Sequence, residues 1–483
     1  MALHRCPLRH QAILSPDAVA VWFEKSRITF SELDDQVVDI QRQLITAGLQ
    51  AGSHLAVVSG NSLTMLRLLL ACLRSGIVFC PLNPRFPAAQ LEEFIKSMDC
   101  DAFYVEEREA LEGLSVSGVV RITQLDSSAI MPNHSTAEMQ EIGLDAEGLC
   151  DLILTSGSSG KAKAAGHCYR NHYYSAVGSQ AQIPLDGHDA WLLSLPLFHV
   201  GGYAIVIRCL LAGAAIVLAP DMVAAQALNH FPVTHLSLVN TQLYRLLQTD
   251  QVSLKDTSIK VILMGGGYVS SDLVADVNTQ GIRILTSYGL TESSSQACTG
   301  TPFFLDSQRL TSGQPLPHRQ VRISQQGEIQ VRGEVLFKGY YQCGGQCNLP
   351  LDEGWFATGN LGFFTDDGQL VVTGRRDNMF ISGGENIQPE EIEKALLALP
   401  GVRQAIVVPV FDREFGQRPV AFVDSNIPDD NLNCLRSGLA LRLVRFKMPE
   451  RIYPWPAEAI NGGLKVNRRF FYALAESWHV HQQ

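Results

Sequence analysis

Apolar segments of strand length alternate with segments of helical length, and this alternation constrains the fold more than any other feature. Between residues 190 and 286, each segment of strand length consists almost entirely of apolar residues. Such strands, separated by helices, are typical of parallel sheets covered on both faces. The sequence therefore predicts an α/β fold with doubly wound sheets. Strands are expected at 190–194, 214–219, 234–238, 259–263 and 282–286, and helices at 200–211, 222–229, 240–249 and 270–279.

The pattern of the chain changes twice after residue 300. Segments 320–324, 328–332 and 369–373 are expected to be hairpin strands next to glycine-containing turns, which predicts a small β subdomain. Beyond it, helices and strands mix again over about 105 residues, which is enough for a separate domain. The sequence predicts a large N-terminal domain, residues 1–375, and a smaller α+β C-terminal domain, residues 376–483.

Net charge and cysteine usage exclude several classes of protein. The chain has 483 residues with a formal net charge of −10 and no basic run, which argues against a nucleic-acid partner. Its 11 cysteines form no CxxC pair, so they are expected to be reduced thiols in a cytoplasmic protein. The first residues contain no apolar segment of the kind that directs secretion.

The stretch 192–220 is long enough and apolar enough to be tested as a membrane span. Its only charged residue, Arg208, would lie near the centre of the bilayer, and Pro196 and several glycines interrupt it. A buried helix followed by a buried strand fits this stretch better. We therefore expect no membrane span.

A loop rich in serine and glycine, Thr155 to Lys163, is the first candidate for chemistry. It follows an apolar strand, 149–154, and precedes a segment, about 168–182, that is expected to be a helix. Hydroxyl groups and glycines here can direct backbone N–H groups into one concavity, and lysines add countercharge, so the loop suits a polyphosphate. A flexible surface loop is the alternative. The loop is not a Walker A motif, because Ala162 follows Lys161 where Ser or Thr is required.

Short motifs spread over nearly the whole chain occur in the order typical of adenylate-forming enzymes. Each motif alone is weak evidence, but their shared order is specific. The chain therefore resembles this family of acyl-CoA synthetases, luciferases and adenylation domains. Within the family, segments 191–200, 234–239 and 384–391 are most similar to the branch that activates 2-succinylbenzoate for menaquinone synthesis. The motifs are 154–163, 195–199, 265–267, 287–292, 354–359, 374–377, 382–387 and 462–465.

The resemblance implies a ligase reaction in two steps that uses ATP, Mg²⁺ and CoA. A carboxylate, here 2-succinylbenzoate, attacks the α-phosphorus of ATP to give acyl-AMP and pyrophosphate, and the CoA thiol then displaces AMP. Both steps depend on positioning and on compensation of negative charge more than on acid–base chemistry.

The resemblance also implies the residues that bind the nucleotide. The loop would hold the β- and γ-phosphates, Thr291 the α-phosphate or AMP, and Tyr288 would stack on adenine. Arg375 would contact the ribose or a phosphate. The full set expected at the nucleotide is Thr155, Ser156, Gly157, Ser158, Ser159, Gly160, Lys163, Gly265, Gly266, Gly267, Tyr288, Gly289, Thr291, Asn360 and Arg375.

Two side chains of these motifs affect the expected ATP and Mg²⁺ chemistry. Glu292 would hold Mg²⁺, which favours few protein carboxylates and many phosphate oxygens. A solvated glutamate in a turn is the alternative. Asn360 stands where the family has an aspartate that binds both ribose hydroxyls, and its neutral amide offers only one acceptor oxygen. This departure puts the affinity for ATP in doubt.

The remaining motif residues would serve catalysis and domain movement. Lys465 would stabilise the adenylation transition state, and His199 would act as a gate between the acid and CoA sites. Asp377 would form the hinge of a mobile C-terminal domain, and Gly383 and Gly384 would line the CoA channel. The alternatives are a solvated lysine, a histidine satisfied in the core and a polar linker residue. The catalytic set is Lys465, His199 and Thr291.

Arg208 is the residue most informative about the substrate. A guanidinium in an otherwise apolar helix requires an anionic partner, because an unpaired buried charge is very costly. That partner is either a structural Asp or Glu or a second carboxylate of the substrate, which 2-succinylbenzoate has. Ser237 matches a polar position of the pocket for this acid in the family.

Several competing functions remain open at the level of the sequence. The chain is alternatively another aryl- or fatty-acyl-CoA ligase, with Arg208 in a structural ion pair. A nucleotide-binding relative without catalysis is suggested by Asn360, although Lys465 argues against it. A stand-alone peptide-synthetase adenylation domain is disfavoured, because no carrier-protein segment follows.

Overall fold

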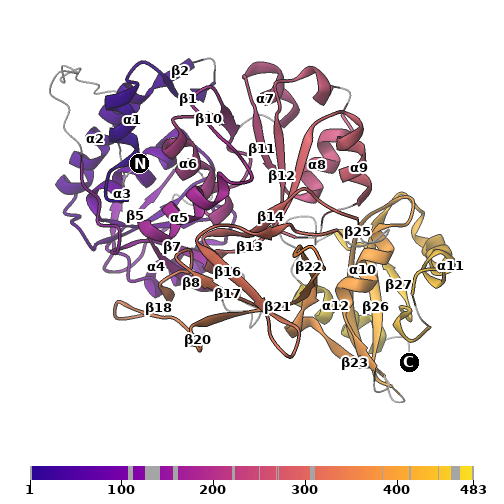
Figure 1. Cartoon of the computed structure of the whole chain (residues 1–483). Coiled ribbons are helices and arrows are strands. Elements are labelled where there is room, and N and C mark those ends of the chain that lie inside the picture. Colours follow the sequence, from indigo (N-terminus) through magenta and orange to yellow (C-terminus); the bar gives the residue numbers. More distant parts are fainter. Residues whose placement is uncertain are drawn as a thin grey trace.

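A computed structural model of the chain shows a large α/β part and a smaller C-terminal part, which lies at one side of the molecule in orange and yellow (Figure 1). The described residues are 3–24, 26–106, 113–123, 125, 142–155, 162–219, 224–249, 251–267, 269, 271–304, 310–382, 385–412, 415–443, 445–457, 459 and 468–480. Within them, no helix is long and apolar enough to cross a membrane. All 11 cysteines are free thiols.

One large sheet has nine strands within the described ranges, in the order β15-β14-β13-β12-β11-β9-β10-β1-β2. Its middle strands, from β13 to β1, are parallel, and β14, β15 and β2 add antiparallel edges. The parallel core agrees with the predicted alternation of strands and helices. The strands are β1 (Val19–Phe23), β2 (Ser26–Thr29), β9 (Ala190–Leu192), β10 (Ala215–Leu218), β11 (His235–Leu238), β12 (Val261–Met264), β13 (Arg283–Leu290), β14 (Ser295–Gly300) and β15 (Gln314–Pro315).

The second large sheet has eight strands in the part of the chain that the structure describes, in the order β19-β18-β8-β7-β4-β3-β5-β6. Strands β7, β4, β3, β5 and β6 are parallel, whereas β8 runs antiparallel to both β7 and β18. The strands are β3 (His54–Val58), β4 (Val78–Leu82), β5 (Ala102–Val105), β6 (Val120–Ile122), β7 (Leu149–Thr155), β8 (Lys163–Cys168), β18 (Gly339–Gln342) and β19 (Gln346–Asn348).

Helices cover both faces of these sheets, as the apolar strands predict. The largest core cluster joins the two sheets through α1, α2, α3, α5 and α6, and α4 packs on the far face of the eight-stranded sheet. Helices α7, α8 and α9 cover the far face of the nine-stranded sheet (Figure 1). The helices are α1 (Pro7–Leu14), α2 (Phe30–Thr46), α3 (Leu63–Ser75), α4 (Ala88–Ser97), α5 (Tyr169–Ser179), α6 (Val200–Ala212), α7 (Ala224–His230), α8 (Asn240–Leu247) and α9 (Ser271–Thr279).

A smaller antiparallel sheet follows, as the glycine-containing turns predict. Its strands are β16 (Arg319–Ile323), β17 (Glu328–Gly333), β20 (Leu351–Asp352), β21 (Trp355–Phe364) and β22 (Leu370–Arg375). The sequence pattern did not predict β21, because Gly359, Asn360 and Gly362 disfavour a strand. Pairing with β17 on one side and β22 on the other supplies the hydrogen bonds that override this preference.

The C-terminal part is a small α+β unit around three strands, of which β25 and β26 form a long hairpin. Its helix α10 reaches the antiparallel sheet, where Lys394 donates to the Val372 carbonyl at 3.2 Å. After β26 the chain forms a 3₁₀ turn (Asp429–Cys434) before the short helix α11. The elements are β23 (Phe380–Ser382), β24 (Glu385–Ile387), α10 (Pro389–Leu397), β25 (Val402–Asp412), β26 (Gly416–Ser425), α11 (Leu435–Ala440), β27 (Ile452–Pro454) and α12 (Arg468–Val480).

The helix expected at about 168–182 is found as α5, but the structure adds a strand, β8, that the sequence did not predict between the serine- and glycine-rich loop and this helix. Strand β8 comes first, and α5 begins only at Tyr169. The Lys-Ala-Ala-Gly sequence that opens β8 has little strand preference, so only pairing with β7 fixes it. The loop therefore joins two antiparallel strands, and α5 does not begin at its end.

Candidate active site

The side chains that follow β11, β12 and β13 surround a cavity of about 870 Å³. In open α/β sheets, ligands bind outside the carboxyl ends of the parallel strands, and this cavity lies at that edge. The antiparallel strands β21 and β22 line it as well, together with Glu390, Glu393 and Lys394 of α10. The cavity therefore receives residues from both parts of the chain.

All described residues of the predicted site line this one cavity. They are Thr155, Lys163, His199, Arg208, Ser237, Gly265, Gly266, Gly267, Tyr288, Gly289, Thr291, Glu292, Asn360, Arg375 and Asp377. The remaining candidates lie outside the described residues: Ser156, Gly157, Ser158, Ser159, Gly160, Gly383, Gly384 and Lys465.

The two ends of the serine- and glycine-rich loop are held next to each other. Thr155 and Lys163 are partners in the antiparallel pairing of β7 and β8. The Lys163 ammonium lies 4.7 Å from the centre of the Tyr340 ring, which is a cation–π contact. A cation is thus held at the cavity beside this loop.

Thr291 and Glu292 lie in a single 3₁₀ turn, Thr291–Ser293, directly after β13. The Tyr340 hydroxyl donates to Glu292 Oε1 at 2.7 Å. Burial, together with the charge of Glu292, raises the pKa of Tyr340, so this tyrosine stays a neutral donor. The sequence motifs did not predict Tyr340 as a neighbour of Glu292, because β18 is distant in the chain and only sheet packing joins them.

Asn360 lies on β21, where its side-chain Nδ2 donates to the Tyr288 hydroxyl at 2.9 Å. Across the β21–β22 pair its register partner is Arg375. The amide N–H group of Asn360 therefore already donates within the protein. The side-chain oxygen of Asn360 can accept a hydrogen bond from a ligand. Burial raises the pKa of Tyr288.

Gly265 shows why its motif requires a small residue. A Cβ atom there would lie 2.6 Å from Ser287 Oγ, so a larger residue would force the Ser287 side chain on β13 to shift. The next residue, Gly266, has φ +78, in the left-handed region that favours glycine. The backbone can therefore approach a ligand closely at this point.

Arg208 lies within helix α6, is 4% exposed and lines the cavity. Its Nη2 donates to Gln296 Oε1 at 2.6 Å and to Ser295 Oγ at 3.3 Å, and its guanidinium lies 5.5 Å from the centre of the Trp191 ring. No carboxylate among the described residues forms an ion pair with it, so the structural Asp or Glu considered above is not found there. Burial lowers the pKa of Arg208 to about 10, which leaves it charged at neutral pH.

A second buried arginine, Arg319, lies close to Arg208 and was not predicted. Its Nε donates to the Pro317 carbonyl and its guanidinium also binds the Gln296 carbonyl. Burial and the nearby charge of Arg208 lower its pKa to about 9. Gln296 thus accepts from Arg208 with its side chain and from Arg319 with its main-chain carbonyl. Nothing in the sequence around residue 319 marks this proximity.

Ser237 and His199 also line the cavity. Ser237 is 2% exposed, and its Oγ accepts from Trp191 Nε1 at 3.2 Å. His199 precedes helix α6 and is exposed, so the alternative of a core histidine is wrong. Its ring contacts Phe198 edge to face, with the ring centres 4.9 Å apart.

The expected hinge lies where β22 ends. Arg375 Nη2 and Asp377 Oδ2 are 3.2 Å apart, and a 3₁₀ turn, Arg376–Asn378, leads to the C-terminal elements. Asp377 is exposed at the rim where the two parts of the chain meet. Gln388 Nε2 donates to the Arg375 carbonyl at 2.9 Å.

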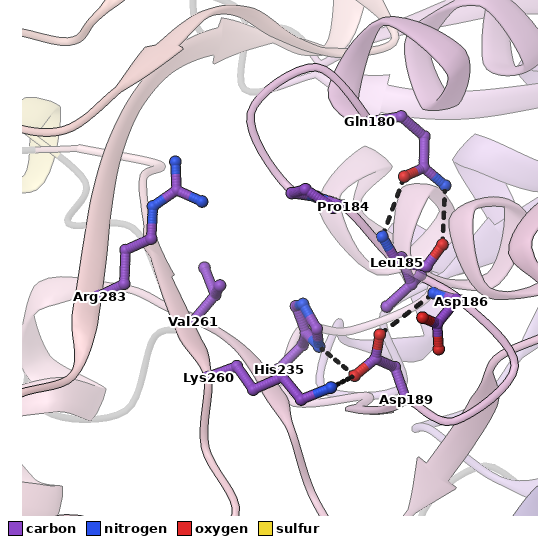
Figure 2. A pocket seen from close by; sticks show the side chains of 9 residues that line it. All are labelled: Gln180, Pro184, Leu185, Asp186, Asp189, His235, Lys260, Val261 and Arg283. Carbon is purple, nitrogen blue, oxygen red and sulfur yellow. Dashed lines mark hydrogen bonds and ion pairs between the residues drawn. The ribbon is translucent and has the colours of Figure 1, made fainter.

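A second hollow, of about 450 Å³, lies at the opposite edge of the nine-stranded sheet, near the amino ends of β11, β12 and β13 (Figure 2). Asp189 Oδ1 lies 2.7 Å from Lys260 Nζ and 3.8 Å from His235 Nδ1. None of the predicted site residues lines this hollow. Asp189 and Lys260 neutralise each other here, which is typical of a structural ion pair.

Comparisons with known proteins identify the family. The AMP-binding enzyme family matches residues 8–341, and the C-terminal domain of AMP-binding enzymes matches residues 391–457. The chain therefore belongs to the AMP-binding enzymes. This agrees with the resemblance that the order of the motifs indicated.

Particular relatives cover nearly the whole chain. The chain is 36% identical to the 2-succinylbenzoate–CoA ligase of Escherichia coli over 99% of both proteins. It is 28% identical to the o-succinylbenzoate CoA synthetase of Bacillus subtilis in complex with the acyl-adenylate intermediate OSB-AMP, with a TM-score of 0.83 over 97% of this chain and 98% of that one. The same enzyme in complex with ATP and a magnesium ion has a TM-score of 0.81 at 28% identity, over 93% and 95%.

Proposed function

We propose that this chain is an ATP-dependent CoA ligase that activates 2-succinylbenzoate, through an acyl-AMP intermediate, for menaquinone biosynthesis. The observation that carries the choice of acid is Arg208, a buried cation that lines the cavity and forms no ion pair with the described residues. A buried charge without a counterion is costly, so the site favours a ligand that brings a carboxylate. A dicarboxylate can supply one to Arg208 and expose the other to activation.

The nucleotide is proposed to lie on the other side of the same cavity. Thr155 and Lys163 flank the loop expected to hold the β- and γ-phosphates, and Thr291, in the turn after β13, would donate to the α-phosphate. Tyr288 and Asn360 would meet adenine and ribose. Adenylation of the acid, with pyrophosphate as the leaving group, then requires mainly alignment of the carboxylate with the α-phosphorus and compensation of charge.

Glu292 is the proposed Mg²⁺ ligand. The fit rests on its place in the cavity and on the hydrogen bond to Tyr340, which occupies Oε1 and orients the carboxylate. One carboxylate together with phosphate oxygens is a donor set that suits Mg²⁺. When bound, the ion neutralises phosphate charge during adenylation.

The C-terminal part is proposed to be a mobile domain, residues 376–483, that turns about Asp377 and brings Lys465 to the site for the first step. The N-terminal domain would comprise residues 1–375. In support, the cavity already receives α10 residues, and polar contacts such as that of Gln388 connect the two parts. The eleven free thiols support a reducing compartment, and we propose the cytoplasm.

Pyrophosphate release tests the function. The purified chain is incubated with ATP, Mg²⁺ and either 2-succinylbenzoate, benzoate or a fatty acid, with and without CoA. We expect release with 2-succinylbenzoate that exceeds release with the mono-acids, and thioester formation only when CoA is present. Preference for a mono-acid would support another acyl-CoA ligase, and nucleotide binding without release under any condition would support a non-catalytic relative.

A further inference from the structure

Three side chains form a buried polar cluster behind the nucleotide side of the cavity. They are Asp151 on β7, His167 on β8 and His172 on α5, all at most 1% exposed. Asp151 Oδ1 lies 2.7 Å from His167 Nδ1, and Asp151 Oδ2 lies 2.6 Å from His172 Nε2. None of the three lines the cavity.

The second ring nitrogen of His167 contacts the main chain of Thr291, one of the residues predicted to bind the nucleotide. His167 Nε2 lies 2.8 Å from the main-chain carbonyl oxygen of Thr291. A carbonyl only accepts hydrogen bonds, so Nε2 carries a proton, and Nδ1 carries another when it donates to the Asp151 carboxylate. These contacts define a buried imidazolium that donates in two directions.

The charges in the cluster agree with this assignment. Burial alone would raise the pKa of Asp151, but its two histidine neighbours outweigh burial and hold that pKa well below its usual range. Burial lowers the pKa of His167, but the Asp151 carboxylate outweighs it and raises the pKa. For His172 burial prevails and lowers the pKa. These directions agree with a protonated His167 beside an ionised Asp151, and with His172 as the histidine that loses its proton more readily.

A metal ion fits the cluster less well. The ligand atoms of Cys150, Asp151 and His172 lie within 4.8 Å of one another. However, burial raises the pKa of the Cys150 thiol, and its Sγ donates to Asp151 Oδ2 at 3.2 Å. A metal requires the thiolate, and it would compete for the carboxylate oxygens that already accept hydrogen bonds.

The carbonyl that His167 binds belongs to a turn that is fixed at its other end as well. Ser294 follows the turn in a left-handed conformation, φ 50, and its carbonyl accepts from Ser175 Oγ on α5 at 2.5 Å. His167 and Ser175 both belong to the segment that follows the serine- and glycine-rich loop. The β8–α5 segment therefore connects two motifs predicted to contact the phosphates.

We propose that His167 is a positioning residue for adenylation: its imidazolium, held by Asp151, binds the Thr291 carbonyl and fixes Thr291 and Glu292 relative to the phosphate loop. This inference rests on the roles proposed above for Thr291 and Glu292. A neutral hydrogen bond could hold a carbonyl, but a charged donor holds it about twice as strongly. The turn is therefore set before the nucleotide arrives.

Two substitutions separate this role from a contribution to folding. The amide nitrogen of Asn lies near the position of histidine Nδ1, and that of Gln near Nε2. His167→Asn therefore keeps a donor toward Asp151 and loses the one toward Thr291, whereas His167→Gln does the reverse. Both replace a buried cation by a neutral amide, so their melting temperatures are expected to fall by similar amounts.

The measurements are the dissociation constant for Mg·ATP without acid, the single-turnover rate of acyl-adenylate formation, and thioester formation from supplied acyl-adenylate. We expect His167→Asn to form acyl-adenylate at least tenfold more slowly than His167→Gln and to bind Mg·ATP more weakly, while thioester formation differs by less than threefold. Equal adenylation by the two variants would overturn the proposal.

His172→Gln is the matched control, because it alters the same buried cluster but does not contact Thr291. It should lower the melting temperature and leave the adenylation rate within threefold of the wild type, and a loss as large as that of His167→Asn would also overturn the proposal.

If no variant folds, ¹⁵N-histidine spectra of the wild type decide. A buried ring with both nitrogens protonated at pH 8 is expected, and its absence would overturn the assignment. Mg·ATP binding needs no acid, so these outcomes are separate from failure of 2-succinylbenzoate as substrate.

Discussion

The two edges of the nine-stranded sheet carry charged groups in opposite states. At the amino edge, Asp189 contacts Lys260, so anion and cation neutralise each other, and His235 lies beside them (Figure 2). At the carboxyl edge, Arg208 lines the larger cavity and forms no ion pair with any acid that the structure describes, and neither does Arg319, which lies beside it and binds main-chain carbonyls. The same strands β11, β12 and β13 contribute to both hollows.

This difference separates a structural role from a binding role. A satisfied ion pair lowers the free energy of the folded chain and gains little from a ligand, whereas buried cations without an anion gain much from one. Neutralisation therefore marks the amino edge as structural, and uncompensated positive charge marks the carboxyl edge as a site for an anion. Volume alone does not make this distinction.

The largest effect is expected for Lys465, which is proposed to act on the cavity at the carboxyl edge and lies outside the described residues. Lys465→Ala should abolish acyl-AMP formation, because the lysine would compensate charge in the first transition state only. Thioester formation from supplied acyl-AMP should remain. Pyrophosphate release and thioester assays on the variant check this, and equal loss of both steps would contradict the assignment.

The second-largest effect is expected for Arg208→Ala, which removes the positive charge that distinguishes the carboxyl edge from the amino edge. We expect the KM for 2-succinylbenzoate to rise more than tenfold, because loss of a buried charged hydrogen bond costs about 2–5 kcal/mol. Turnover of benzoate should not fall, and Arg208→Lys should rescue poorly, since an ammonium lacks the planar fork.

Lys260→Ala is the matched control for Arg208→Ala, because it removes a cation from the opposite edge of the same sheet. It should leave the KM unchanged. A lower melting temperature of Arg208→Ala with equal losses for every acid would instead make Arg208 structural.

Asp189→Asn tests the amino edge, where we expect loss of stability without loss of activity. Burial raises the pKa of Asp189, but the hydrogen bond from Lys260, together with hydrogen bonds from the Asp186 main chain and Thr234 and the nearby His235, outweighs burial and lowers the pKa. The carboxylate therefore stabilises the fold above the unfolded pKa of about 4, and this contribution is lost as the pH falls through the lower folded pKa.

At pH 7 the free energy of unfolding should fall by about 1–3 kcal/mol, toward the lower value because Lys260 is largely exposed to solvent. Urea unfolding of both proteins at pH 7 and pH 3 checks this, and the difference should shrink at pH 3. A changed KM for either substrate would show that the two edges are coupled.

The smallest expected effect is at Asn360. Asn360→Asp should tighten ATP binding by about 1–2 kcal/mol, because a charged acceptor binds hydroxyl groups more strongly than a neutral one. The Tyr288 hydroxyl can then donate to the new carboxylate. Calorimetric titration with ATP decides, and an unchanged or weaker affinity would mean that the ribose is held differently here.

The sequence by itself determined the alternating strands and helices and the order of the motifs, and the Thr29-Phe30-Ser31-Glu32 segment at the start of α2 has the local pattern of a capping box. Thr29 accepts from the Glu32 N–H, and Glu32 accepts from the Thr29 N–H, as the local pattern predicts. Such features depend on residues three or four apart or on a continuous apolar run, so the local sequence suffices. The parallel sheets followed from the same runs.

Only the tertiary structure decided which residues meet across long distances in the chain. Strands β8 and β21 have weak local preference and exist because their neighbours pair with them. The Arg208–Gln296 contact and the His167–Thr291 hydrogen bond join segments more than eighty residues apart. Whether a buried arginine has an acid beside it depends on such packing, so its role as an anion site is visible in the fold and not in the local sequence.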